Sequence, residues 1–209
     1  MDQVIKDQLF FPATLRNRYP IREVFSEILP KEGTILEVGS GSGEHAVFFQ
    51  KSFPNILWQS SDINYSHLKS ISAWIRAVGL ENQMVKPINI DISKKNWEID
   101  REIKVNLKAI VAINVLHISS YHCTTILIEE SSRLLKNGGS LIMYGPFKRD
   151  GLHTSISNQI FDKQLKSEKK EWGVRDISDI KVIAEKNGFS EYKIFNMPAN
   201  NHILTYKKA

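Results

Sequence analysis

The sequence predicts an α/β fold in which helices flank both faces of a seven-stranded, mostly parallel sheet. Apolar runs of strand length alternate with amphipathic stretches of helix length, which is typical of parallel βαβ units. A glycine-rich segment, residues 39–43, follows the first apolar run and precedes an amphipathic stretch. Glycines at such a strand-to-helix turn let the backbone approach a ligand closely, so a small-molecule site is expected there.

Strands are expected at seven apolar runs, residues 34–38, 56–61, 84–89, 108–115, 140–144, 192–197 and 202–207. Helices are expected at residues 14–29, 44–53, 66–78, 121–135 and 176–186. Only Pro198–Asn201 separates the last two strands. Because a parallel return needs about a dozen residues or more, these two strands must form an antiparallel hairpin.

Two segments lie outside this alternation. Residues 1–32 are interpreted as an N-terminal helical lid, and residues 146–175 as a substrate-side insertion. Both lie at chain positions where α/β folds place lids. The 209 residues, of which 42% are hydrophobic and 24% charged, fit one domain.

Composition excludes some classes of protein. The single Cys123 cannot form an internal disulfide, and no apolar stretch approaches the roughly 20 residues of a membrane span. The N-terminus, Met1–Asp7, lacks a secretory apolar run, so a cytoplasmic location is expected. The net charge of +5 leaves RNA as an alternative partner, but the lysines of residues 163–170 alternate with acids, as on a solvated helix face.

The glycine-rich segment favours one class of cofactor. A dinucleotide fingerprint would place its third glycine at position 44, where Glu44 stands. The pattern E-x-G-x-G-x-G resembles instead the first motif of class I S-adenosylmethionine-dependent methyltransferases. That resemblance implies contacts to the methionine half of the cofactor from Glu37, Gly39, Ser40, Gly41, Gly43 and His45.

Acids follow the next two strands. Asp62 lies 21 residues after Gly41, where a carboxylate accepts hydrogen bonds from ribose hydroxyls, and Ile63 follows it. Asp91, followed by Ile92, lies after the third strand, where class I methyltransferases place an acceptor for the adenine amino group. A helix cap or a turn is the alternative interpretation of Asp91.

Further candidates follow the fourth and fifth strands. Asn114 and Leu116 are expected at the cofactor and His117 is a candidate base, although packing or capping is an equal alternative for His117. In the insertion, His153 is the second candidate base, with Asp150 to orient it and Arg149 to bind an anion. A surface loop tied by local Asp–Arg and Asx hydrogen bonds is an equal alternative for these three residues. The remaining candidates for substrate or for a cofactor carboxylate are Arg16, Asn17, Tyr144, Asn158 and Arg175. No metal site is expected, because Asn114 stands where metal-dependent enzymes of the catechol type supply a carboxylate.

Nearly the whole chain is similar to the uncharacterised family called domain of unknown function 938, the family of methyltransferase-like protein 26. The matching segments include Phe11-Pro12-Ala13, Arg16-Asn17, Glu37 to His45, Ser61-Asp62, Leu116 to Ser119, Tyr144 to Phe147, His153-Thr154, Phe161-Asp162, Trp172 to Asp176 and Met197 to Asn201. The resemblance implies a Rossmann-like class I methyltransferase fold with S-adenosylmethionine as cofactor and S-adenosylhomocysteine as product. It names no methyl acceptor.

The expected activity is methyl transfer to a small molecule, since no appended domain is present to recognise a macromolecule. A non-catalytic S-adenosylmethionine-binding regulatory module and an RNA methyltransferase are the alternatives. A nicotinamide reductase is disfavoured by Glu44. The sequence does not indicate an oligomeric state.

Overall fold

The computed structural model describes residues 6–209. Met1–Ile5 lie outside the described residues; the predicted lid and the predicted non-secretory N-terminus both begin with them. The described chain forms two units, residues 6–91 with 97–111 and residues 92–96 with 112–209. The prediction that residues 1–209 form one domain stays a prediction.

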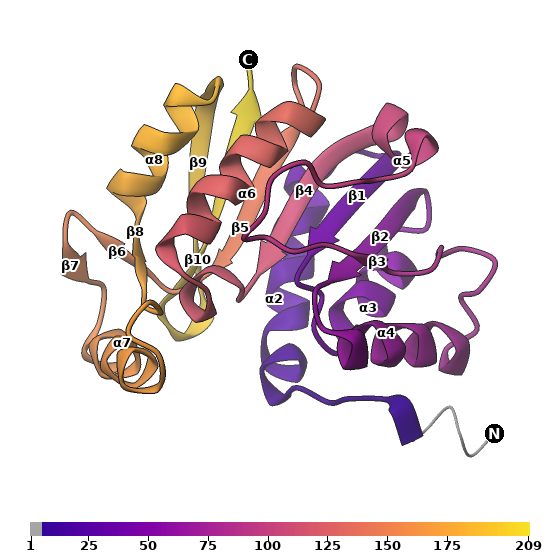
Figure 1. The fold of residues 1–209 in the computed structure, drawn as a ribbon, viewed down its shortest axis with the longest axis horizontal. Helices are drawn as coiled ribbons and strands as arrows, with labels where there is room; N and C mark the ends of the chain where they lie inside the picture. The colour runs from indigo at the N-terminus through magenta and orange to yellow at the C-terminus, as the bar shows by residue number, and fades with distance from the viewer. Residues whose placement is uncertain (1–5) are drawn as a thin grey trace. The chain divides into compact units, whose positions relative to one another are not determined.

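The strands form a seven-stranded sheet in the order β3-β2-β1-β4-β5-β10-β9 (Figure 1). β1 pairs with β2 in parallel, and β2 pairs with β3 in parallel. β10 pairs antiparallel with both β5 and β9. The predicted fold class is therefore confirmed, including the single antiparallel strand contributed by the C-terminal hairpin.

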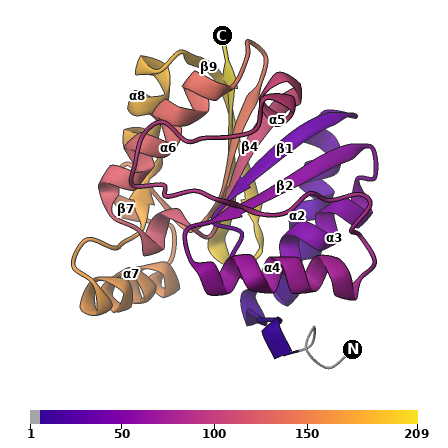
Figure 2. The same ribbon diagram turned by 45° about the vertical axis from the view of Figure 1, so that its right-hand side comes forward.

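A proline opens the long N-terminal helix of the first unit, as is common at the first helical position. Its elements are α2 (Pro12–Ile28), β1 (Gly33–Val38), α3 (Glu44–Ser52), β2 (Ile56–Asp62), α4 (Tyr65–Ala77), β3 (Ile88–Asn89), α5 (Arg101–Asn106) and the start of β4 (Leu107–Ile113). α3 and α4 both pack against β2, and α2 packs against α3 (Figures 1 and 2).

Aromatic rings fill the core of the first unit. Phe25 of α2, Phe49 of α3 and Trp58 of β2 are fully buried, with ring centroids 5.0 to 6.1 Å apart. Burying side chains of this size contributes roughly 2 to 3 kcal/mol each, so this cluster fixes α2 and α3 on β2, the strand that pairs with β1.

The second unit contains the end of β4 and the remaining elements. They are η1 (Leu116–Ile118), α6 (Tyr121–Leu134), β5 (Ser140–Gly145), β6 (Phe147–Arg149), β7 (Leu152–His153), α7 (Ile156–Glu168), β8 (Arg175–Asp176), α8 (Ile177–Lys186), β9 (Phe189–Met197), η2 (Pro198–Asn200) and β10 (Asn201–Lys208). α6 packs against α8, and α8 packs against β9. β10 lies between β5 and β9 with its middle residues buried.

The predicted elements differ from the observed ones at a few ends. The expected strand 84–89 is only Ile88–Asn89, because Met84 closes a turn onto the Leu80 carbonyl and Pro87 has no N–H to donate. The expected strand 108–115 ends at Ile113, since Asn114 has a left-handed φ of 58°. The predicted insertion 146–175 is ordered: it holds α7 and most of a small sheet with the strand order β7-β6-β8.

Candidate functional site

The glycine turn between β1 and α3 has a backbone that only glycine adopts without strain. φ is +68° at Gly39, +59° at Gly41 and +92° at Gly43. A Cβ on Gly41 would lie 2.8 Å from the Phe11 ring, and one on Gly43 would lie 2.7 Å from Cα of Ile71. The turn therefore needs glycine both for its φ angles and for the close approach of its neighbours.

Asp62 connects the end of β2 to this turn. Its Oδ2 accepts a hydrogen bond from the Gly41 N–H at 2.9 Å, and its Oδ1 accepts one from the Asn64 N–H at 2.9 Å. Nδ1 of His67 lies 3.1 Å from the same Oδ1. A carboxylate has about four acceptor sites, so Oδ2 keeps capacity for one further donor such as a ribose hydroxyl.

The N-terminal strap, residues 9–11, lies on the glycine turn and on α4. The Phe11 N–H donates to Oε2 of Glu44 at 2.8 Å, and Nε1 of Trp74 donates to the Leu9 carbonyl at 3.0 Å. The rings of Phe10 and Trp74 meet edge to face at 5.2 Å. Glu44, which breaks the dinucleotide fingerprint, is thus a buried acceptor that fixes the strap.

Glu37 at the end of β1 points into the core. It is 1% exposed, and its Oε2 accepts a hydrogen bond from Nε1 of Trp58 at 3.1 Å. Burial raises the pKa of Glu37 from 4.5 to about 7, against the lowering effect of the Trp58 and Ser40 hydrogen bonds. In this structure Glu37 supports the strand that carries the turn.

His45 and Asn17 form a buried pair. Nε2 of His45 lies 2.8 Å from Oδ1 of Asn17, and the imidazole stacks on Phe49 at 5.5 Å. Burial, and secondarily the charge of Arg18, lowers the pKa of His45 to about 3, so its ring is neutral at working pH. Because the amide oxygen of Asn17 accepts a hydrogen bond from Nε2–H, Asn17 sets the tautomer of His45. The neighbouring candidate Arg16 is exposed.

The ends of β2 and β3 meet in the first unit. The Ile90 N–H donates to the Asp62 carbonyl at 3.3 Å, and Nε1 of Trp97 donates to the Asp91 carbonyl at 3.2 Å. Ile63 is 57% exposed beside Asp62. The predicted residues Gly39, Gly41, Asp62, Ile63 and Asp91 therefore lie at the carboxyl ends of β1, β2 and β3.

In the second unit, the segment after β4 folds onto the end of β5. The Asn114 N–H donates to the Tyr144 carbonyl at 2.9 Å, and a Cβ on Gly145 would lie 3.4 Å from Nδ1 of His117. Leu116 and His117 are buried in η1, and Tyr144 is buried in β5. Burial, followed by the charge of Arg175, lowers the pKa of His117 to about 4. Ile92 is half-buried at the start of this unit.

Arg175 is buried and anchors the segment around η1. Its Nη2 donates to the Ser119 carbonyl at 2.7 Å, its Nη1 to the Gly173 carbonyl at 2.6 Å and its Nε to Oγ1 of Thr124 at 3.1 Å. Burial lowers the pKa of Arg175. These bonds use a donor on each guanidinium nitrogen, so the observed role of Arg175 is to hold this segment against α6.

The residue that orients His153 is Asp162, and this corrects the expectation that Asp150 does so. Nε2 of His153 lies 3.3 Å from Oδ2 of Asp162, whereas Oδ1 of Asp150 accepts from Oγ of Ser178 at 3.2 Å. Oδ1 of Asp162 accepts from the Val174 N–H at 2.7 Å. An acceptor-only carboxylate at Nε2 favours the His153 tautomer with its proton on Nε2, which leaves Nδ1 as a proton acceptor.

Burial of His153, with a nearby lysine charge, favours the neutral form of its imidazole. Burial, and then the charge of Lys148, lowers the pKa of His153 below its ordinary value. Burial raises the pKa of Asp162, but hydrogen bonds from Lys166 and Val174 bring it below its usual range. An ionised Asp162 beside a neutral His153 is the arrangement that a general base requires.

Arg149 and Asn158 lie in the same part of the second unit. Nη2 of Arg149 donates to Oδ1 of Asn196 at 3.0 Å. Asn158 is buried, and its Nδ2 donates to Oγ1 of Thr154 at 3.1 Å and to the Asn200 carbonyl at 2.9 Å. Asn158 therefore ties α7 to the turn between β9 and β10.

A family model described as "Protein of unknown function (DUF938)" matches residues 8–208. The chain belongs to this family. This membership confirms the resemblance noted in the sequence, and the family's description assigns no activity.

Among solved structures, the DUF938 chain is similar to an O-methyltransferase family protein from Burkholderia thailandensis, at 15% identity and a TM-score of 0.76, over 94% of this chain and 57% of that one. It is similar to human N-acetylserotonin methyltransferase in complex with S-adenosylmethionine, at 15% identity and a TM-score of 0.73, over 92% and 52%. An O-methyltransferase family 2 protein from Planctomyces limnophilus, in complex with apigenin, matches at 16% identity and a TM-score of 0.75, over 94% and 60%. The chain spans little more than half the length of these proteins, and the likeness shows the fold.

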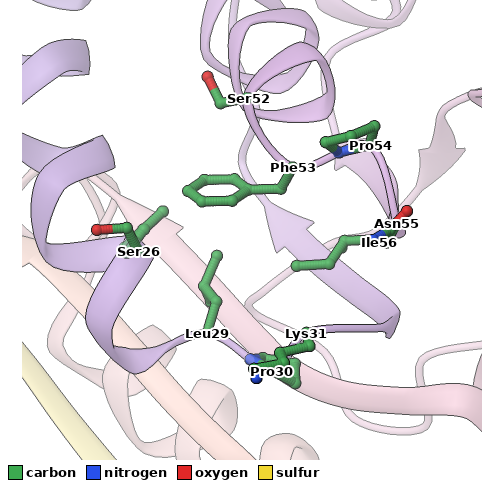
Figure 3. A pocket seen from close by; sticks show the side chains of 10 residues that line it. Ser26, Leu29, Pro30, Lys31, Ser52, Phe53, Pro54, Asn55 and Ile56 are labelled. Carbon is green, nitrogen blue, oxygen red and sulfur yellow. The ribbon is translucent and has the colours of Figure 1, made fainter.

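A cavity of about 370 Å³ in the first unit lies away from these residues (Figure 3). Leu29, Phe53 and Ile56 point toward one another in it, from the ends of α2 and α3 and the start of β2. Because β1 and β2 are parallel, this cavity lies at the amino end of β2, opposite the end that carries Glu37 and Asp62. It is therefore separate from the candidate site.

Sequence reasoning missed the strap contacts of Phe11, the His67 imidazole beside Asp62 and the pairing of Asp162 with His153. Phe11 and Asp162 lie in segments that match the family, which was the available signal. Within residues 6–209, no helix is long and apolar enough to cross a membrane, and no three acidic, histidine or cysteine side chains gather as metal ligands would.

Proposed function

We propose that this DUF938 protein is an S-adenosylmethionine-dependent methyltransferase that acts on a small molecule. The main support is Asp62, whose carboxylate holds the Gly41 N–H at 2.9 Å and retains acceptor capacity at the end of β2. The fold shared with methyltransferases agrees with this function.

The residues of the first unit fit the cofactor. The glycine turn has no Cβ at Gly39, Gly41 and Gly43, so backbone can approach the methionine half closely. Asp62 would accept from a ribose hydroxyl, and Asp91 would serve the adenine. When bound, S-adenosylmethionine supplies an electrophilic methyl group on a sulfonium. The predictions for Ser40, His45, Ile92, Asn114 and Leu116 as cofactor residues stay predictions.

His153 is the proposed general base. Its Nδ1 would take the proton of the acceptor hydroxyl or amine, which makes the acceptor atom nucleophilic toward the methyl group that the cofactor would supply. Asp162 positions the imidazole through Nε2. His117, which is more deeply buried and has a pKa near 4, is the weaker base.

Titration calorimetry with S-adenosylmethionine, S-adenosylhomocysteine and NADH tests the cofactor assignment. We expect the two sulfur nucleosides to bind, NADH not to bind, and Asp62→Ala to lose that binding. Asp62→Asn keeps one oxygen for a backbone N–H and separates loss of the carboxylate from collapse of the turn. Glu81→Gln, at an exposed acid of the same unit, is the charge control. No binding of either sulfur nucleoside to the folded wild type would refute the proposal.

Turnover separates an enzyme from a regulatory cofactor-binding module. Release of S-adenosylhomocysteine is followed while fractions of a metabolite extract are supplied as acceptors. We expect His153→Ala to abolish turnover and leave cofactor affinity unchanged, and Asp162→Asn to shift the pH profile of turnover. Equal loss of turnover and cofactor affinity in His153→Ala would contradict the base assignment.

A further inference from the structure

A second cavity, of about 500 Å³, lies in the second unit between β7 and the turn that joins β9 to β10. Its polar lining includes Arg149, His153, Thr154, Asn196, Asn200 and His202. Small-molecule sites have volumes of roughly 300 to 1,000 Å³, so this cavity is large enough for a metabolite.

Two imidazoles of this cavity lack a partner on one side. His202 is 5% exposed, and within residues 6–209 its Nδ1 is buried with no hydrogen-bond partner. Nδ1 of His153 is in the same condition. Leaving a buried polar group unpaired costs about 1 to 3 kcal/mol, so such groups in a cavity lining indicate a ligand that pairs with them.

The lining carries one cation and no acid. Arg149 is exposed and lines the cavity, and the observed partner of its Nη2, Oδ1 of Asn196, is neutral. Burial, followed by the charge of Arg149, lowers the pKa of His202, so His202 is a neutral donor or acceptor. The nearby Asp162 is already paired with Lys166 at 2.7 Å. A guanidinium without a carboxylate partner binds oxyanions through its fork of N–H donors.

Hydrogen bonds also hold other parts of the lining in place. Nδ2 of Asn158 joins Thr154 to the Asn200 carbonyl, and Nδ2 of Asn201 donates to the Pro198 carbonyl at 3.2 Å. A wall that is already ordered loses little conformational entropy when a ligand binds.

We propose that this cavity binds the oxyanion, a carboxylate or a phosphate, of the small molecule that the protein methylates. Arg149 binds the oxyanion through its guanidinium, and His202 donates to it from Nδ1–H. His153, which lines the same cavity, accepts the proton of the acceptor group through Nδ1. The identity of the ligand as the methyl acceptor rests on the proposed function; the anion site itself does not.

Inorganic phosphate and acetate are titrated calorimetrically into the full chain at constant ionic strength, with no cofactor present. We expect Arg149→Gln to weaken binding about tenfold or more, because a charge-assisted bidentate contact is lost. His202→Leu removes the donor and is expected to weaken binding, while His202→Asn keeps a donor near the Nδ1 position and restores it. Lys163→Gln removes an exposed cation of α7 and is expected to change nothing.

Each arm has a defined consequence. Tighter binding of phosphate identifies a phosphorylated acceptor, and tighter binding of acetate identifies a carboxylic acid. No binding to the wild type, or equal binding to wild type and Arg149→Gln, overturns the inference. S-adenosylmethionine is titrated into the same variants. If S-adenosylmethionine binds and the anions do not, the proposed function is retained and the anion site is refuted. If the anions bind and S-adenosylmethionine does not, the anion site is retained and the proposed function is refuted.

Discussion

Replacing Glu37 with Gln is expected to change how the stability of the protein depends on pH. The folded-state pKa of Glu37 is about 7 and its ordinary value is 4.5. Since the raised pKa reflects a buried neutral carboxyl, the stability that Glu37 contributes is fully present below pH 4.5. That stability is lost as the pH rises through 7, because the unfolded chain ionises first.

The size of this effect follows from the shift. A difference of roughly 2.5 pKa units, at about 1.4 kcal/mol per unit, corresponds to roughly 3 kcal/mol in the free energy of unfolding. Gln keeps an oxygen for Nε1 of Trp58 and cannot ionise. The free energy of unfolding of Glu37→Gln minus that of wild type should therefore rise by roughly 3 kcal/mol between pH 4.5 and pH 8. Any cost of its unpaired amide N–H adds a constant, which does not alter the pH dependence.

Urea unfolding followed by far-ultraviolet circular dichroism at several pH values measures this difference. The lowered pKa values of His45, about 3, and His117, about 4, act with the opposite sign, because the stability they contribute is present above pH 6.5 and lost as the pH falls. Subtracting the two proteins removes this common histidine contribution. Glu81→Gln serves as the exposed control. A difference between Glu37→Gln and wild type that stays constant from pH 4.5 to 8 would refute the reasoning.

Two further substitutions test the backbone and the buried guanidinium. Gly43→Ala should lower the free energy of unfolding by several kcal/mol more than Gly79→Ala, because both glycines have positive φ but only the Cβ at 43 meets the Ile71 backbone; equal losses in urea unfolding would contradict this. Arg175→Lys should lower the free energy of unfolding by about 2 to 3 kcal/mol, because one ammonium cannot reach all the acceptors that the three guanidinium nitrogens contact. A melting temperature equal to that of wild type would contradict this.

The features that could be predicted from sequence are those specified by neighbouring residues. Four residues between two strands allow only a hairpin, and β9 and β10 pair as predicted. The glycine turn and Asp62 belong to one strand-to-helix pattern, and the structure joins them through the Gly41 N–H. In both cases chain connectivity leaves little conformational choice.

The features that sequence reasoning missed depend on how separate segments pack. Asp150, three residues before His153, was the nearest acid in sequence, but the side chain that meets His153 is Asp162 of α7. The helical path of α7, which Ser155 begins by capping the Asn158 N–H, determines this pairing. The apolar residues around Met84 predicted a longer strand, but Met84 is buried in a turn. In a sequence, an apolar residue buried in a turn cannot be told from one buried in a strand.

The strap contact of Trp74 gives the protein an intrinsic optical reporter. The Trp74 indole donates to the Leu9 carbonyl and lies against the Phe10 ring, so its surroundings depend on residues 9–11. Detachment of those residues would hydrate the indole and move its fluorescence to longer wavelength. Because the sequence has four tryptophans, the part of the emission that Trp74→Phe removes can follow the attachment of this segment in real time, including during addition of a nucleoside.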